Sequence, residues 1–180
     1  FNYSEKMYIP QIGVMIDASR NSVPDPAFLR SILDRMALMG LNCLILYMED
    51  VYELEGEPRF GYMRGGYTRE QLRQMDDYAH SYGISIVASI QVLGHMEKVL
   101  RFPEYAFLRD SASCLLAGEE KTYELIEKML RTIGQCLRSR IIIVGMDETH
   151  GLGEGQYRQR NGFRQPLDIF LEHLQRVHAL

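Results

Sequence analysis

Two adjacent carboxylates, Asp147 and Glu148, directly follow the apolar run Ile141–Gly145 and its Met146, and His150 comes two residues later. An aliphatic run that ends in glycine is typical of a buried strand. In α/β proteins the chemistry lies at the carboxyl ends of such strands. Two carboxylates held close together cannot both ionise freely, so the pKa of one rises and that group becomes a general acid near neutral pH. The sequence therefore predicts an acid/base site at this strand end.

Neighbouring residues of a strand point to opposite faces, so Asp147 and Glu148 can line one pocket only if the chain leaves strand geometry there. Glycines at positions 145, 151 and 153 permit such a change of direction.

Polar side chains also follow three other apolar runs. They are Asp17 and Arg20 after Gly13–Ile16, then Tyr47, Glu49 and Asp50 at the end of Asn42–Tyr47, and Gln91 and His95 at the end of Ile84–Gln91. A single strand-end acid is usually a helix cap or a surface ion pair. Four strand ends that all carry such groups are better explained by one shared pocket.

Amphipathic helices are predicted between the runs. The first has the N-cap Asp25, Pro26 and a stop at Gly40, and the second has a capping box of Thr68 and Gln71 and a stop at Gly83. Apolar residues between 125 and 137 mark a long third helix, and those from 167 onward start a fourth. Alternating strands and helices predict a parallel sheet. Four such units are half of a barrel of roughly 250 residues. We expect residues 1–180 to form one α/β domain, the N-terminal half of a (β/α)8 TIM barrel, truncated before its second half.

The composition gives no support for nucleic acid or a membrane as a binding partner. The net charge is −4 and the Lys and Arg residues are scattered, which gives no reason to expect nucleic acid. No apolar run approaches a membrane span, so no membrane partner is expected. The cysteines, Cys43, Cys114 and Cys136, are too few for a disulfide framework, and two of them lie on apolar faces. These features favour a reducing, cytoplasmic setting.

Two other interpretations of the acidic residues have weaker support in the sequence. A metal site would draw its ligands from Asp17, His95, Asp147, Glu148 and His150, but no HExxH or paired-His spacing supports it, and we expect no metal and no cofactor. A helicase-like Asp-Glu-x-His box would need a phosphate-binding loop upstream, and the chain contains no Gly-Lys pair. That second reading fails.

Two further segments carry weaker signals. The stretch 156–164 is predicted to be an exposed loop and connection. The aromatic residues Phe60, Tyr62 and Tyr67, in a long loop after the second strand, could equally stack on a ligand or pack beneath the loop.

The assembled segments resemble the family-20 glycoside hydrolases, the β-N-acetylhexosaminidases, and most closely their hexosaminidase D-like branch. The matching stretches are Gly13–Arg20, Leu46–Asp50, Gly61–Gly65, Gln91–Glu97, Gly145–Glu148 and Leu152–Gly155, in the order of the family. The Gly-x-Asp-Glu stretch alone would be weak evidence, but the set is specific and spans nearly the whole chain.

The resemblance implies an exo-acting, retaining enzyme that removes terminal N-acetylglucosamine or N-acetylgalactosamine without a protein nucleophile, because the acetamido oxygen of the substrate attacks instead. Carried over, Glu148 would be the acid/base and Asp147 would orient the acetamido group. Asp17, Asp50 and His95 match positions around the sugar pocket. We also assign Arg20 and His150 to substrate binding.

The sequence departs from the family in three ways. Ile12 stands where the family usually has an arginine that grips sugar hydroxyls, and Ile143 stands where it often has a histidine. Strands five to eight of the barrel are also absent, so we expect little activity from the 180 residues alone and self-association through the exposed half-barrel edges. A non-catalytic sugar-binding barrel and a metal-dependent hydrolase on the same fold remain the rival functions.

Overall fold

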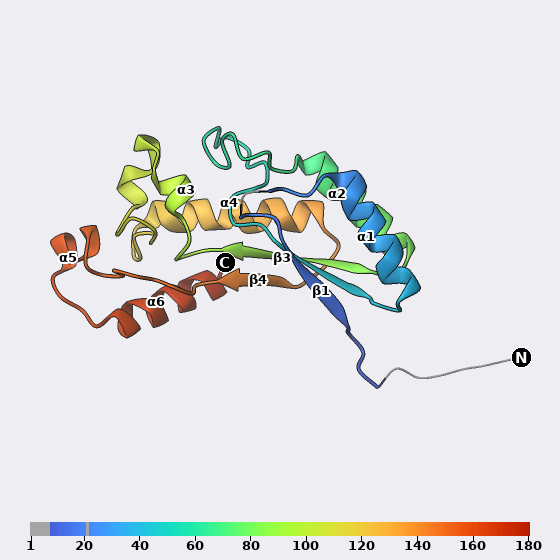
Figure 1. The fold of residues 1–180 in the computed structure, drawn as a ribbon. Coiled ribbons are helices and arrows are strands. Elements are labelled where there is room, and N and C mark those ends of the chain that lie inside the picture. The colour runs from blue at the N-terminus through green and yellow to red at the C-terminus, as the bar shows by residue number, and fades with distance from the viewer. Residues whose placement is uncertain (1–7, 21) are drawn as a thin grey trace, which may run out of the picture.

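The structure is a computed structural model that describes residues 8–20 and 22–180. Its centre is one sheet of four parallel strands in the order β1-β2-β3-β4 (Figure 1). The strands are β1 Gly13–Asp17, β2 Cys43–Tyr47, β3 Ser85–Gln91 and β4 Ile142–Gly145. Each predicted strand is confirmed to within one residue at either end, because four short apolar runs bounded by polar turns leave little choice of boundary.

The parallel register brings the strand ends to one edge of the sheet. Asp17 pairs with Tyr47, and Tyr47 pairs with Ser89. Gln91, the last residue of β3, pairs with Gly145, the last residue of β4. Residues that follow these positions therefore emerge on the same side of the molecule, as predicted.

The four longer helices run along the sheet in chain order. They are α1 Pro26–Leu38, α2 Arg69–Ser81, α4 Glu120–Cys136 and α6 Pro166–His178. Contacts join α1 to α2, α2 to α4 and α4 to α6. In Figure 1, α1, α2 and α4 lie along one side of the sheet and α6 lies next to β4. The helices thus form one layer that follows the order of the strands.

The predicted helix caps are confirmed. The Asp25 carboxylate accepts a hydrogen bond from the Ala27 N–H at 2.7 Å, and Thr68 and Gln71 form both bonds of the capping box. Gly40 and Gly83 lie just past the ends of α1 and α2 in the left-handed conformation that glycine favours.

Three short helices had not been predicted: α3 Glu97–Leu100, the 3-10 helix η1 Pro103–Leu108 and α5 Gln156–Asn161. The expectation that 156–164 is a loop is therefore wrong for its first part. The buried carboxylate of Asp110 explains α5, because it accepts from the backbone N–H groups of Gly153 and Tyr157 at 2.6 and 2.9 Å. Tyr157 is itself buried.

The loop between β2 and α2 packs on its own aromatic side chains. Phe60 and Tyr67 are buried, and the Tyr67 hydroxyl donates to the Pro24 carbonyl at 2.7 Å. Tyr62 remains partly exposed and meets Phe102 edge to face. Packing is therefore the role of Phe60 and Tyr67.

The two central strands are buried and the two edge strands are not. Leu44, Leu46, Ile86 and Ile90 are at most 2% exposed, whereas Met15 on β1 is 57% exposed. The three cysteines are free and buried. Among the described residues, none of the helices combines the length and the apolar character needed to cross a membrane.

Candidate active site

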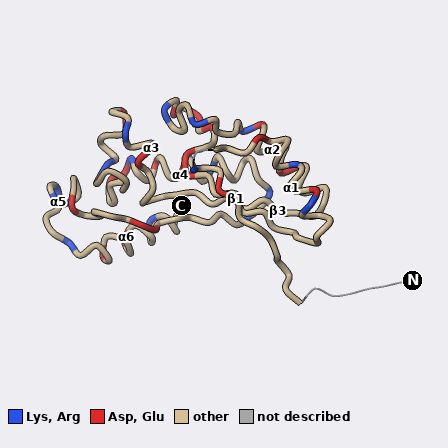
Figure 2. Tube along the Cα trace, viewed as in Figure 1, with Lys and Arg blue, Asp and Glu red and all other residues tan. Residues whose placement is uncertain are grey.

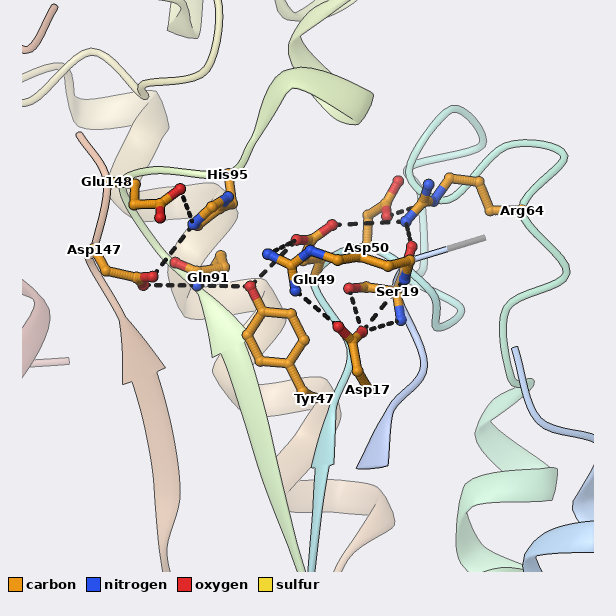
Figure 3. A network of polar contacts seen from close by, with 11 residues as sticks. Asp17, Ser19, Tyr47, Glu49, Asp50, Arg64, Gln91, His95, Asp147 and Glu148 are labelled. Carbon is orange, nitrogen blue, oxygen red and sulfur yellow. Dashed lines mark hydrogen bonds and ion pairs between the residues drawn. The ribbon is translucent and has the colours of Figure 1, made fainter. Parts of the chain in front are cut away.

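The polar residues at the four strand ends form one continuous network (Figure 3). Asp17 comes from β1, Tyr47 and Glu49 from the end of β2, Gln91 from β3 and Asp147 from the residues after β4. The network has two parts. We call the carboxylates of Asp147 and Glu148, which both face His95, the acid pair. We call Asp17, Glu49 and Asp50, together with Arg20 and Arg64, the arginine cluster.

Asp147 is held at both of its carboxylate oxygens. Oδ1 accepts from the side-chain amide of Gln91 at 2.9 Å, and Oδ2 lies 3.2 Å from His95 Nε2. The hydrogen bond from Gln91 is the main cause that holds the pKa of Asp147 below its ordinary value, and His95 adds to it. Asp147 is therefore the member of the pair that is kept charged.

Glu148 reaches the same histidine from the next position in the chain. Its Oε2 lies 3.5 Å from His95 Nε2, so both carboxylates converge on one ring nitrogen. Adjacent residues can face the same group only if the backbone departs from strand geometry. Glu148 departs from it, with a φ of 49°. The predicted change of backbone direction is confirmed. The assignment of Glu148 as the acid of the pair stays a prediction.

Backbone strain gathers at this edge of the sheet. Among the described residues, four that are not glycine have left-handed backbones, and three of them, Glu49, His95 and Glu148, belong to the network. Such conformations cost about 1–3 kcal/mol each and persist where the surroundings impose them. Gly94 shows how tight the surroundings are, because a Cβ there would overlap the Asp147 carbonyl.

Arg20 and Asp17 occupy the first strand end together. Arg20 Nη1 donates to Asp17 Oδ2 at 2.8 Å, and Ser19 donates to Oδ1 through its hydroxyl at 2.7 Å. Burial opposes ionisation of Asp17, but the hydrogen bonds from Arg20 and Ser19 outweigh it and lower its pKa. Arg20 also lies 3.7 Å from Glu49 and 5.1 Å above the Tyr47 ring. Arg20 thus belongs to the network and is paired to acids, and its assignment to substrate binding stays a prediction.

Asp50 is buried against Arg64, a residue to which the sequence reasoning gave no role. Arg64 Nε lies 2.8 Å from Asp50 Oδ1, while Nη2 donates to the Ser19 carbonyl at 2.5 Å and lies 3.6 Å from Glu49. The close pair is not aligned as a hydrogen bond, and neither Asp50 oxygen has another partner among the described residues. Burial therefore raises the pKa of Asp50, and Arg64 opposes it.

Tyr47 joins the two parts. Its hydroxyl accepts from Gln91 Nε2 at 2.9 Å and donates to Glu49 Oε1 at 3.2 Å. The amide of Gln91 thus uses one N–H on Tyr47 and the other on Asp147. The apolar runs place Tyr47 and Gln91 at strand ends, but neither residue is assigned a role in the site from the sequence. The signal for such a role is their position shortly before Glu49 and His95.

His150 lies outside this network. Its backbone carbonyl accepts from the Ser111 hydroxyl at 3.0 Å, and the residue is exposed. Its assignment to substrate binding stays a prediction. In the described part of the chain, no group of three or more His, Cys, Asp or Glu side chains is arranged to hold a metal ion. The proposed ligand set of Asp17, His95, Asp147, Glu148 and His150 is therefore not assembled.

Positive charge is spread over the helices and loops in Figure 2 and does not form a single stripe. The arginines that matter to the site are the two in the arginine cluster.

Comparison with known proteins identifies the family. The sequence model of glycosyl hydrolase family 20, catalytic domain, matches residues 12–168. The chain belongs to this family. The matched range contains all four strands and every residue of the network.

Similar sequences carry hexosaminidase names. Human hexosaminidase D is 26% identical over 145 residues, which cover 78% of this chain and 30% of the human protein. β-Hexosaminidase 3 of Arabidopsis thaliana is 27% identical over 150 residues, covering 77% of this chain and 27% of the plant protein. The chain thus spans about a third of the length of these relatives, which are glycoside hydrolases.

Solved family-20 structures share the fold. The exo-β-N-acetylglucosaminidase of Vibrio harveyi, in complex with N-acetylglucosamine, has a TM-score of 0.79 at 18% identity and covers 96% of this chain and 34% of its own. The β-N-acetylhexosaminidase of Streptomyces coelicolor has a TM-score of 0.78 at 21% identity, with 96% and 37% covered. The predicted α/β class and the partial (β/α)8 barrel are confirmed by these matches.

Proposed function

We propose that the protein to which this chain belongs is an exo-acting β-N-acetylhexosaminidase that works by retaining, substrate-assisted hydrolysis. The observation that carries the proposal is the acid pair: two adjacent carboxylates converge on His95, and one of them is held charged. Family membership supports the glycosidase class, and the unequal surroundings of the two carboxylates support this mechanism.

Asp147 has the properties needed to orient an acetamido group. Its carboxylate is fixed by Gln91 and His95, yet the side chain remains 63% exposed, so lone pairs are left for a substrate N–H. As the acetamido oxygen attacks the anomeric carbon, positive charge develops on the acetamido group. A fixed, ionised carboxylate beside the N–H stabilises that charge.

Glu148 would carry out the proton transfers. In the first step its carboxyl proton passes to the glycosidic oxygen while the bond from that oxygen to the anomeric carbon breaks, and an oxazolinium-type intermediate forms. In the second step Glu148 takes a proton from water, whose oxygen attacks the anomeric carbon and reopens the ring. The sugar is released with its original anomeric configuration.

The test uses the full-length gene product and chromogenic N-acetylglucosaminides and N-acetylgalactosaminides. We expect Glu148→Gln to lower kcat by roughly 10²- to 10⁴-fold, the range for loss of a general acid. The loss should be smaller for a nitrophenyl glycoside than for a disaccharide, because nitrophenolate leaves without a proton. Glu124→Gln, an exposed change on α4, is the matched control and should leave kcat unchanged.

Other outcomes would decide against the proposal. Binding of N-acetylhexosamine without hydrolysis of either substrate would identify a sugar-binding barrel. Activity lost to a chelator and restored by a divalent ion would identify a metal-dependent hydrolase. The 180-residue chain by itself should show little or no turnover, and clear hydrolysis abolished by Glu148→Gln would overturn that expectation.

Two smaller proposals concern the setting of the chain. Free, buried cysteines support the cytoplasmic location. The exposed Met15 on β1 and Ile143 on β4 lie on the two edge strands, which supports self-association of the 180 residues. Sedimentation of the purified chain over a range of concentrations tests the second proposal: a monomer at all concentrations would contradict it.

A further inference from the structure

Gln91 occupies the centre of the network although it cannot take part in acid/base chemistry. It is the last residue of β3 and 1% exposed. Both hydrogens of its amide nitrogen are used, on the Tyr47 hydroxyl and on Asp147 Oδ1, each at 2.9 Å. Its Oε1 is buried and has no partner among the described residues. The side chain thus serves these neighbours as a donor only.

The orientation of this amide follows from its neighbours. If the amide were turned over, its oxygen would face the Asp147 carboxylate, and two acceptors would meet without a hydrogen between them. The N–H side must therefore point to Asp147. Tyr47 supports this orientation, because its own hydrogen is directed to Glu49 and its oxygen is free to accept from Gln91.

Gly145 provides the space for the amide. It pairs with Gln91 in the register of β3 and β4, and a Cβ at position 145 would overlap the Nε2, Cδ and Oε1 atoms of Gln91. The Gln91 side chain lies across β4 at this point to reach Asp147, two residues further on. The glycine before the acid pair is thus explained by close packing of a side chain, not by its backbone conformation.

We propose that Gln91 is a positioning residue that fixes and keeps ionised the carboxylate of Asp147, and that Gly145 is required for it to do so. The inference rests on the proposed function for its role in catalysis, but the coupling between the two side chains exists without substrate. An amide suits this task better than an acid. A carboxyl group at position 91 would share a proton with Asp147 and favour its neutral form.

The hydrogen bond from Gln91 is also the main cause of the low pKa of Asp147. Its loss should therefore raise that pKa. The charged form of Asp147 would then appear only at higher pH, so the acidic limb of the pH–rate profile should move upward.

The first experiment follows the Asp147 carboxyl carbon by NMR through a pH titration of the full-length gene product. Gln91→Ala should raise the pKa of Asp147 towards its ordinary value, and Gln91→Glu should raise it further. Gln74→Ala is the matched control, since Gln74 also donates to a carboxylate, that of Glu70, but on the exposed face of α2. It should leave the titration unchanged.

A second variant tests the same contact without removing the glutamine. Gly145→Ala should displace the Gln91 amide and so raise the pKa of Asp147, as Gln91→Ala does. If Gln91→Ala does not fold, Gly145→Ala tests the inference in its place. An unchanged Asp147 titration in either folded variant would overturn the inference.

The second experiment separates this inference from the proposed function. In the full-length gene product, Gln91→Ala should lower kcat by about 100-fold near neutral pH, the size expected when a reacting group is misplaced, and shift the acidic limb upward. A purely structural role would lower the amount of folded enzyme without moving that limb. A shifted Asp147 titration in a protein that hydrolyses no N-acetylhexosaminide would overturn the proposed function and retain the role of Gln91 in positioning Asp147.

Discussion

The arginine cluster and the acid pair lie at the same edge of one sheet, only two strands apart, but their carboxylates differ in exposure and in the groups they face. In the arginine cluster the Glu49 and Asp50 side chains are 6% and 4% exposed and face arginines. In the acid pair the Asp147 and Glu148 side chains are 63% and 66% exposed and face an amide and an imidazole. Glu49 and Asp50 are thus enclosed beside arginines, and burial raises the pKa of both, while Asp17 at the rim of the cluster is 39% exposed. The carboxylates of the acid pair are open to solvent.

We infer that this difference separates the charges that build the site from the charges to which the proposed function gives a chemical role. A carboxylate enclosed beside arginines, as in Glu49 and Asp50, is shielded from solvent and from a ligand. An amide can fix a carboxylate without neutralising it. We infer that the arginine cluster holds the ends of β1 and β2 in place, while the acid pair is left available to a substrate.

The largest effect is expected from breaking the arginine cluster. Arg64→Met keeps the length of the side chain but leaves the buried Asp50 carboxylate without its cation, and it removes the hydrogen bond to the Ser19 carbonyl. Removing one partner of a buried ion pair costs about 3–5 kcal/mol. Urea unfolding at pH 7 should show a loss of this size in the free energy of unfolding.

The pH dependence supplies the control. Burial already raises the pKa of Asp50, and without Arg64 it rises further. When the pKa of a carboxyl group is raised in the folded state, the free energy of unfolding falls as the pH rises through that pKa. The stability that Arg64→Met loses should therefore be smaller when unfolding is repeated at lower pH. Adding Asp50→Asn should restore much of the loss at pH 7. A deficit that is equal at both pH values would mean that Arg64 contributes packing and not charge.

A matched pair of substitutions sharpens the comparison. Burial raises the pKa of Glu49, and Arg20 opposes this effect. Glu49→Gln should lower the free energy of unfolding by about 1–2 kcal/mol, because one buried oxygen that faces an arginine becomes an N–H donor without an acceptor. Glu148→Gln should change it by less than about 0.5 kcal/mol, as expected at an exposed position. Both residues follow a strand and both have left-handed backbones, so the two variants differ chiefly in their surroundings. Equal losses would contradict the division into a structural and a reactive group.

The sequence was sufficient for the acid pair and for the strands that carry it. Hydrophobic periodicity and turn residues depend only on nearby sequence. The four apolar runs are therefore enough to predict that Asp17, Glu49, His95 and Asp147 lie at one edge of the sheet. The capping box at Thr68 is local for the same reason. The position of each of these residues is determined by the few residues next to it in the sequence.

The sequence could not reveal the groups that act over long distances. Arg64 lies in a loop without periodicity, and its acceptor, the Ser19 carbonyl, is 45 positions away. Helix α5 begins where a buried carboxylate, that of Asp110, accepts from the backbone more than 40 positions further on. Such pairings follow from the tertiary fold, and no spacing rule reports them.

The smallest effect concerns the strained backbone. Glu148 has a φ of 49°, which costs a residue with a side chain about 1–3 kcal/mol, whereas glycine adopts it freely but loses more entropy on folding. Glu148→Gly should therefore increase the free energy of unfolding by about 0.5–1 kcal/mol, although it removes the proposed acid. Met63→Gly is the control, since Met63 has a φ of 57° on an exposed loop and no place in the network.

Both glycine variants should gain stability in urea unfolding, and only Glu148→Gly should lose turnover in the full-length product. That result would show that the conformation of Glu148 is maintained at a cost to stability, as expected where a side chain is held for chemistry. A loss of stability in Glu148→Gly together with a gain in Met63→Gly would show the reverse. The carboxylate of Glu148 would then stabilise the fold through His95, and the acid pair would resemble the arginine cluster more than its exposure suggests.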